Sequence, residues 1–177
     1  MKQTCWMHHL PFRLTSALAL ALALLSPTPA LAEPAAIYVV RHGEKQAAGK
    51  DPELTAQGKA RAQNVAAMLR KAGIEAVFSS QTTRTVQTAQ PMAHVAGVEV
   101  QTYDPSKPEA MVAKVKALKG GAVLVVGHSN TVPALVRMFG GAPGTDIADD
   151  EYDRVYQLHI GADGKITTVL LTSLPTI

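Results

Sequence analysis

The chain has 177 residues, which is the size of a single domain. Hydrophobic residues make up 47% and charged residues 18%, and this balance excludes a disordered chain, a coiled coil and a collagen. The net charge is +3 without a run of lysine or arginine, so the sequence gives no indication of nucleic-acid binding. A single cysteine excludes an internal disulfide framework and a zinc site built from several thiolates.

The first 32 residues have the layout of a secretory signal peptide. Lys2 and Arg13 flank the start of an apolar stretch over residues 17–25, which is about half the ~20 residues that a membrane-spanning helix needs. Two prolines and a small-residue triplet ending at Ala32 follow this stretch. We therefore expect cleavage after Ala32 and a periplasmic or secreted domain over residues 33–177, with membrane contact only during export.

Two continuous apolar runs in this domain predict central β-strands. They cover residues 35–40 and 122–126, and they are rich in β-branched side chains without alternating between apolar and polar residues. Such runs are typical of strands that are covered on both faces of a sheet. Shorter runs at residues 77–78 and 98–100 predict two further strands.

Four helices are predicted between and after these strands. The first follows an apolar stripe from Leu54 to Ala72, with Thr55 as its N-cap and Gly73 as its stop. The other three are predicted at residues 82–90, 111–118 and 131–138.

Strands that alternate with helices are typical of right-handed βαβ units and a parallel sheet. The end of the chain differs, because residues 155–160 and 166–171 predict a terminal hairpin. We expect one α/β domain of three layers, in which a mostly parallel central sheet has helices on both faces and a C-terminal hairpin.

Two histidines and two arginines follow the ends of the predicted strands. Arg41 and His42 come after the first strand, His128 comes after residues 122–126, and Arg84 lies in the helix after a third strand. Ligands bind beyond the carboxyl ends of strands in open α/β sheets, so we expect these side chains to meet. Arginine forks bind phosphate oxygens, and a neutral imidazole can attack phosphorus, so the set suits phosphoryl chemistry without a metal.

Four motifs, in the expected order along the chain, resemble those of the histidine phosphatase superfamily, the phosphoglycerate mutase-like proteins. The motifs are Arg41-His42-Gly43, Leu54-Thr55-x-x-Gly58, Ser79-Ser80-x-x-x-Arg84-x-x-x-Thr88-Ala89 and Gly127-His128-Ser129-Asn130. They span about residues 37–140. The short chain is similar to the compact branch that includes bacterial phosphohistidine phosphatases.

The resemblance implies a role for each of the four residues. His42 would be the nucleophile and would become phosphohistidine. Arg41 and Arg84 would bind the phosphate, and His128 would be a second pocket histidine that donates to the phosphoryl oxygens. No cofactor and no metal ion is implied.

The resemblance also implies a carboxylic acid that protonates the leaving alcohol. Asp104 is the first candidate because it follows the strand predicted at residues 98–100, and Glu109 and Glu44 are two others. An Asp before proline is as typical of a turn, so the donor stays open. A separate acidic cluster is predicted to be a solvated turn and not a calcium loop: Asp149, Asp150, Glu151 and Asp153.

The sequence thus predicts an exported, metal-independent phosphoric monoester hydrolase that acts on a small phosphorylated substrate. One alternative is a protein phosphohistidine phosphatase or a phosphomutase. The other is a non-catalytic phosphate-binding module.

Overall fold

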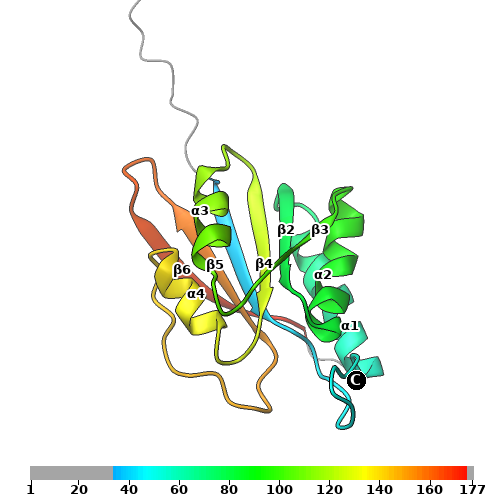
Figure 1. Ribbon diagram of the computed structural model, residues 1–177. Coiled ribbons are helices and arrows are strands. Elements are labelled where there is room, and N and C mark those ends of the chain that lie inside the picture. Colours follow the sequence, from blue (N-terminus) through cyan, green and yellow to red (C-terminus); the bar gives the residue numbers. More distant parts are fainter. Residues whose placement is uncertain (1–33, 175–177) are drawn as a thin grey trace, which may run out of the picture. The chain divides into compact units, whose positions relative to one another are not determined.

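The computed structural model describes residues 34–174 (Figure 1). The signal peptide predicted over residues 1–32, and its cleavage site, lie outside the described residues. The described elements follow one another in the order β1 (Ala36–Arg41), α1 (Ala56–Leu69), β2 (Ile74–Ser80), α2 (Thr83–Ala96), β3 (Val100–Tyr103), α3 (Glu109–Ala117), β4 (Ala122–Gly127), α4 (Val132–Met138), β5 (Arg154–Ile160) and β6 (Ile166–Thr172).

The strands form one mixed sheet in the order β3-β2-β4-β1-β5-β6. β1, β2, β3 and β4 pair in parallel, and β5 pairs antiparallel with both β1 and β6. Every residue of β1 and β4 is buried, as expected for apolar runs covered on both faces. The predicted parallel core and C-terminal hairpin are therefore confirmed.

Helices cover both faces of the sheet and complete the three layers (Figure 1). Val65 of α1 and Met92 of α2 pack with Tyr38, Val40 and Leu124 on one face. The alternate residues of the same strands pack against α3 and α4 on the other face, in a cluster that includes Ile37, Val39, Val125, Val115 and Leu135. The predicted single α/β domain is confirmed. In the described part of the chain, no helix is long and apolar enough to cross a membrane.

Two elements differ from their predicted bounds. α2 continues through Pro91 to Ala96 and ends at Gly97, which has a φ of 68° and donates its N–H to the carbonyl oxygen of His94. Proline removes one backbone hydrogen bond and is disfavoured inside a helix, which is why the helix was predicted to end near Pro91. Glycine in the left-handed conformation ends a helix more sharply, and α2 ends there. β3 begins at Val100 and runs to Tyr103, two residues later than the apolar run suggested.

The parallel pairing fixes where the histidine-bearing turns lie. Arg41 at the end of β1 is directly opposite Gly127 at the end of β4, and the N–H of His42 donates to the Gly127 carbonyl at 2.9 Å. β2 pairs with the other side of β4 and ends at Ser80. The carboxyl ends of three neighbouring strands therefore deliver their next residues to one edge of the sheet.

Candidate active site

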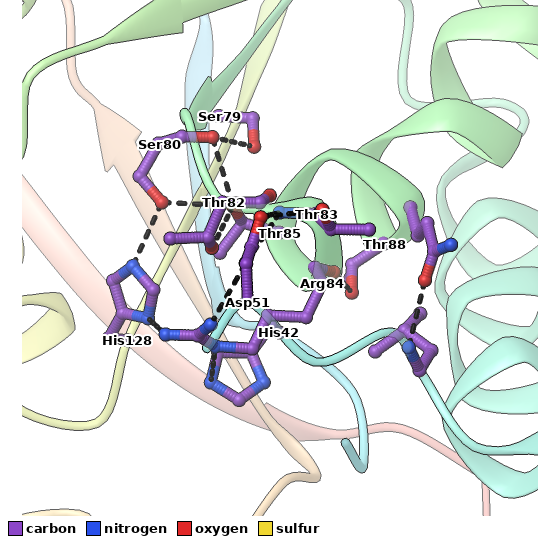
Figure 2. A network of polar contacts seen from close by, with 12 residues as sticks. His42, Asp51, Ser79, Ser80, Thr82, Thr83, Arg84, Thr85, Thr88 and His128 are labelled. Atoms are coloured by element: carbon purple, nitrogen blue, oxygen red, sulfur yellow. Dashed lines mark hydrogen bonds and ion pairs between the residues drawn. The ribbon is translucent and has the colours of Figure 1, made fainter. Parts of the chain in front are cut away.

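The four residues singled out in the sequence line one pocket of about 570 Å³ at this edge. His42 follows β1, Arg84 lies in the first turn of α2, and His128 follows β4, as Figure 2 shows. The pocket is lined by Arg41, His42, Lys45, Arg84, Pro105, Ser106, His128, Ser129, Asn130, Thr131 and Asp149.

The ring of His42 is buried with one nitrogen fixed by the backbone. Its Nδ1 lies 2.8 Å from the carbonyl oxygen of Gly43, and a carbonyl can only accept, so Nδ1 carries the hydrogen. Burial, together with the charges of His128, Arg84 and Arg41, lowers the pKa of His42 to about 4, although the hydrogen bond to Gly43 acts in the opposite direction. The ring is therefore neutral at pH 7, and its Nε2 carries a lone pair and no hydrogen.

Arg84 lies between the two histidines. Its Nε donates to Nε2 of His42 at 3.3 Å, and its Nη2 lies 3.4 Å from Nδ1 of His128. Asp51 approaches Nη1 at 3.4 Å and also accepts from the backbone N–H and hydroxyl of Thr83 (Figure 2). Asp51 thus connects the loop after β1 with the start of α2 and helps to orient the guanidinium.

His128 closes the other side of this group. Its ring centroid lies 5.3 Å from that of His42, in an edge-on arrangement, and its Nε2 lies 2.9 Å from Oγ of Ser80. Burial, together with the charges of Arg84 and Arg41, lowers the pKa of His128 to about 4. Both histidines are therefore uncharged at neutral pH.

Arg41 lines the pocket but directs part of its guanidinium to a neighbouring segment. Its Nη1 donates to the carbonyl oxygens of Ala148 and Glu151, both at 2.7 Å, and the guanidinium carbon lies 4.0 Å from the ring centroid of Tyr152. Its Nε is buried and has no hydrogen-bond partner among the residues described. Arg41 therefore anchors the segment 148–152 at the pocket rim and has one buried donor without an acceptor among the described residues.

The glycines of two motifs allow α1 to approach the His42 loop. A Cβ on Gly43 would lie 2.7 Å from the carbonyl oxygen of Gly58, and a Cβ on Gly58 would lie 2.2 Å from that of Glu44. Both contacts are to backbone atoms, which cannot move without moving the loop. The N–H of Gly43 also donates to Oγ1 of Thr88 at 3.0 Å, so α2 holds the same loop from the other side.

The three predicted proton donors do not line the pocket. Glu44 forms a bidentate ion pair with Arg61; burial raises the pKa of Glu44, but hydrogen bonds and the charge of Arg61 outweigh it and the net pKa is lowered. Asp104 is exposed, and hydrogen bonds from the N–H and hydroxyl of Ser106 lower its pKa. Glu109 is exposed in the first turn of α3.

Two acidic residues near the pocket were assigned no catalytic or binding role from the sequence alone. Asp149 lines the pocket with an exposed side chain, although its cluster was predicted to be only a solvated turn. Asp51 gave no motif signal, because its contact with Arg84 joins residues 33 positions apart. Within residues 34–174, no group of three or more His, Cys, Asp or Glu side chains is arranged to hold a metal ion.

A model of the family described as the histidine phosphatase superfamily (branch 1) matches residues 37–105, which carry three of the four motifs. This match supports a relationship between this part of the chain and the histidine phosphatase superfamily. A search of curated proteins found no match.

Several solved structures share the fold of this chain. A SixA protein of Agrobacterium tumefaciens, provisionally named a phosphohistidine phosphatase, is 20% identical with a TM-score of 0.61, covering 78% of this chain and 99% of that one. The protein histidine phosphatase SixA in complex with tungstate is 19% identical with a TM-score of 0.57, covering 78% and 96%. A mycobacterial glucosyl-3-phosphoglycerate phosphatase is 15% identical with a TM-score of 0.60, covering 80% and 99%.

Proposed function

We propose that the chain is a metal-independent phosphatase that hydrolyses a phosphomonoester through a covalent phosphohistidine at His42. The observation that carries this proposal is the fixed, neutral ring of His42, whose unprotonated Nε2 accepts from Nε of Arg84 in the pocket. A neutral imidazole with its lone pair directed at a cationic phosphate-binding group is prepared to attack phosphorus. The family match and the phosphatase folds are consistent with this chemistry.

The reaction would proceed in two displacements. The lone pair of Nε2 forms an N–P bond while the bond between phosphorus and the leaving oxygen breaks, and that oxygen takes up a proton. The Gly43 carbonyl, which accepts from Nδ1, stabilises the positive ring that results. Water then attacks phosphorus, the N–P bond breaks with its electrons returning to Nε2, and the water gives up a proton as phosphate leaves.

Two arginines would stabilise the phosphoryl oxygens. Arg84 has one donor beside His42 and another beside His128. The buried Nε of Arg41 has no acceptor among the described residues, and a phosphoryl oxygen would supply one. A buried donor without an acceptor is costly, so its pairing with a bound oxyanion favours binding. Charge stabilisation of this kind is the main requirement of phosphoryl transfer.

His42→Ala tests the proposal, with p-nitrophenyl phosphate as the substrate and His94→Ala as the control. His94 is an exposed histidine of α2 outside the pocket. We expect His42→Ala to abolish both turnover and the phosphoenzyme trapped by acid quench, and the wild type to keep its activity in EDTA. Full activity of His42→Ala would refute the proposal, and a trapped phosphoenzyme without turnover would favour a phosphate-binding module.

A protein phosphohistidine phosphatase is the second candidate, and the position of the three predicted proton donors favours it. Asp104, Glu109 and Glu44 all lie outside the pocket, whereas Asp149 lines it with an exposed side chain. An alkoxide leaves poorly without a proton donor, but an imidazole leaves a P–N bond as a neutral ring once its other nitrogen is protonated.

Rates with a series of aryl and alkyl phosphates distinguish the two candidates. If no carboxyl assists, the rate falls steeply as the leaving alcohol becomes less acidic, and a phosphoramidate is cleaved faster than an alkyl phosphate. Asp149→Asn and Asp104→Asn should then keep the wild-type slope. A variant that slows only the alkyl phosphates would identify its carboxyl as the donor and favour the phosphomonoester.

We also propose that the enzyme is exported, on the basis of the sequence of residues 1–32 alone. Expression of the full chain in a bacterium with N-terminal sequencing of the product tests this. We expect the product to begin at Glu33, and a product that begins at Met1 would refute export by this route.

A further inference from the structure

A chain of three hydroxyl groups, two of them buried, ends on His128. Oγ of Ser80 lies 2.9 Å from Nε2 of His128 and 2.9 Å from Oγ1 of Thr85, and Thr85 Oγ1 lies 2.9 Å from Oγ1 of Thr82 (Figure 2). The side chains of Ser80 and Thr85 are fully buried, at 0% exposure. Neither residue lines the pocket, so the chain acts from behind the histidine.

The direction of these hydrogen bonds follows from their acceptors. Thr85 Oγ1 lies 2.9 Å from the carbonyl oxygen of Ser80 and 2.8 Å from that of Thr82. Carbonyls only accept, so the single hydroxyl hydrogen of Thr85 is directed to them. Toward Ser80, Thr85 Oγ1 must therefore accept, and the single hydrogen of Ser80 is used in that bond. Ser80 Oγ is then left to accept from Nε2 of His128.

The other side of the ring leads to the same assignment independently. Nδ1 of His128 lies 3.4 Å from Nη2 of Arg84, and a guanidinium has donors but no acceptor. A hydrogen on Nδ1 would point at the hydrogens of Arg84. This long contact favours the lone pair on Nδ1 and the hydrogen on Nε2, which is the arrangement that the shorter Ser80 contact requires.

We propose that Ser80 and Thr85 are positioning residues that hold His128 in the Nε2–H tautomer, so that its pocket-facing Nδ1 is a proton acceptor. The inference rests on the proposed function in one respect, since the phosphoryl group is what Nδ1 would meet. In this tautomer the neutral ring accepts at Nδ1, and it donates to a phosphoryl oxygen only after it has taken up a proton there. A substrate that binds as its protonated monoanion would supply that proton.

The consequence differs from the role that the resemblance implied. A histidine that donates from Nδ1 in its neutral form would need Nε2 to accept from Ser80, and the hydroxyl of Ser80 is already directed to Thr85. The low pKa of His128, caused by burial and by Arg84 and Arg41, keeps the ring neutral, so its tautomer decides what it offers to a ligand. An enzyme whose active-site histidine is held in the wrong tautomer loses much of its activity.

Nitrogen-15 NMR of histidine rings in the folded protein tests the tautomer directly. The His128 signals are assigned by their absence in His128→Asn, and two-bond proton correlations show which nitrogen carries the hydrogen. We expect Nε2–H in the wild type and a mixture of tautomers in Ser80→Ala and Thr85→Val, whereas Thr85→Ser, which keeps the hydroxyl, should retain Nε2–H. An Nδ1–H tautomer in the wild type would refute the proposal.

Kinetics supply the second readout. With p-nitrophenyl phosphate, we expect Ser80→Ala to lower kcat about tenfold or more, as the loss of a buried hydrogen bond predicts, with a smaller change in KM. Ser79→Ala is the matched control, because Ser79 is equally buried on the same strand and donates to the Ser80 carbonyl without contacting His128. If a folded Ser80→Ala protein keeps both the tautomer and the wild-type kcat, the positioning role is wrong.

The two proposals fail in different ways. The NMR measurement needs no turnover, so an inactive wild-type protein with an Nε2–H tautomer would refute the phosphatase and support the positioning role. An active protein with an Nδ1–H tautomer would do the reverse. If Ser80→Ala does not fold, the wild-type spectrum and the comparison of Thr85→Val with Thr85→Ser still decide the question.

Discussion

Neutralising Glu44 distinguishes a structural ion pair from a proton donor. Glu44 and Arg61 are joined by hydrogen bonds of 3.0, 3.0 and 2.5 Å, and their side chains are only 13% and 9% exposed. Glu44→Gln removes the counter-charge of a buried guanidinium, and breaking such a pair costs about 3–5 kcal/mol. Arg61 keeps its hydrogen bond to Ser173 at 2.8 Å, so we expect Glu44→Gln to lower the free energy of unfolding by about 3 kcal/mol, the lower end of this range.

Urea unfolding measures this loss. With a denaturant slope of about 2 kcal/mol per molar for a domain of this size, the midpoint should fall by roughly 1.5 M. Glu53→Gln is the matched control, because Glu53 pairs with Lys59 at 3.9 Å through side chains that are 56% and 60% exposed. A surface pair of that kind contributes about 0–1 kcal/mol, so the control should move the midpoint little.

The activity of the folded Glu44→Gln protein completes the experiment. We expect aryl and alkyl phosphates to be hydrolysed at wild-type rates below the unfolding transition, since Glu44 faces Arg61 and does not line the pocket. The reasoning is refuted if Glu44→Gln is no less stable than Glu53→Gln, or if it selectively loses alkyl phosphate hydrolysis. The second result would make Glu44 the proton donor.

Three further changes test the packing and protonation of the His42 loop. Gly58→Ala places a Cβ 2.2 Å from the Glu44 carbonyl, so we expect it to lose about 3 kcal/mol in urea unfolding and most of its aryl phosphatase activity. Thr88→Val removes the acceptor of the buried Gly43 N–H and should cost about 1–3 kcal/mol, whereas Thr88→Ser should cost less. His42 has a folded pKa of about 4 against 6.5 when unfolded, so the unfolded chain binds more protons between these values. His42 should therefore lower the stability by about 3 kcal/mol as the pH drops from 6.5 to 4, and His128, whose pKa is lowered in the same way, should add to this loss. We expect His42→Asn to remove the His42 part and leave the His128 part in unfolding measured across that range.

Much of the pocket could be predicted because parallel strands bring their carboxyl ends to one edge. The apolar runs before Arg41 and Gly127 predicted two central strands, and the common direction of such strands predicted that His42 and His128 would meet. The structure pairs the two strands directly. The pattern after Ser80 predicted a helix that carries Arg84, and the structure places this arginine in the first turn of α2. These inferences needed only local patterns and the topology that such patterns favour.

The parts that could not be predicted depend on contacts between distant residues. Arg41 anchors Ala148 and Glu151, which lie 107 and 110 positions away, and no local pattern specifies that contact. Asp104 was placed at the correct edge, but its carboxylate accepts from Ser106 two residues later. The Asp-Pro-Ser sequence is typical of such a turn and carried a signal for it.

The motif residues divide into those that hold His42 and those that hold His128. Gly58 and Thr88 fix the loop of the first histidine from α1 and α2, and Ser80 fixes the ring of the second from the end of β2. Arg84 is the one side chain of this group that contacts both rings. Because different side chains hold the two rings, Ser80→Ala should alter the tautomer of His128 while the Gly43 carbonyl keeps the hydrogen of His42 on Nδ1. That separation explains why residues without contact to the pocket belong to the same motifs as those that line it.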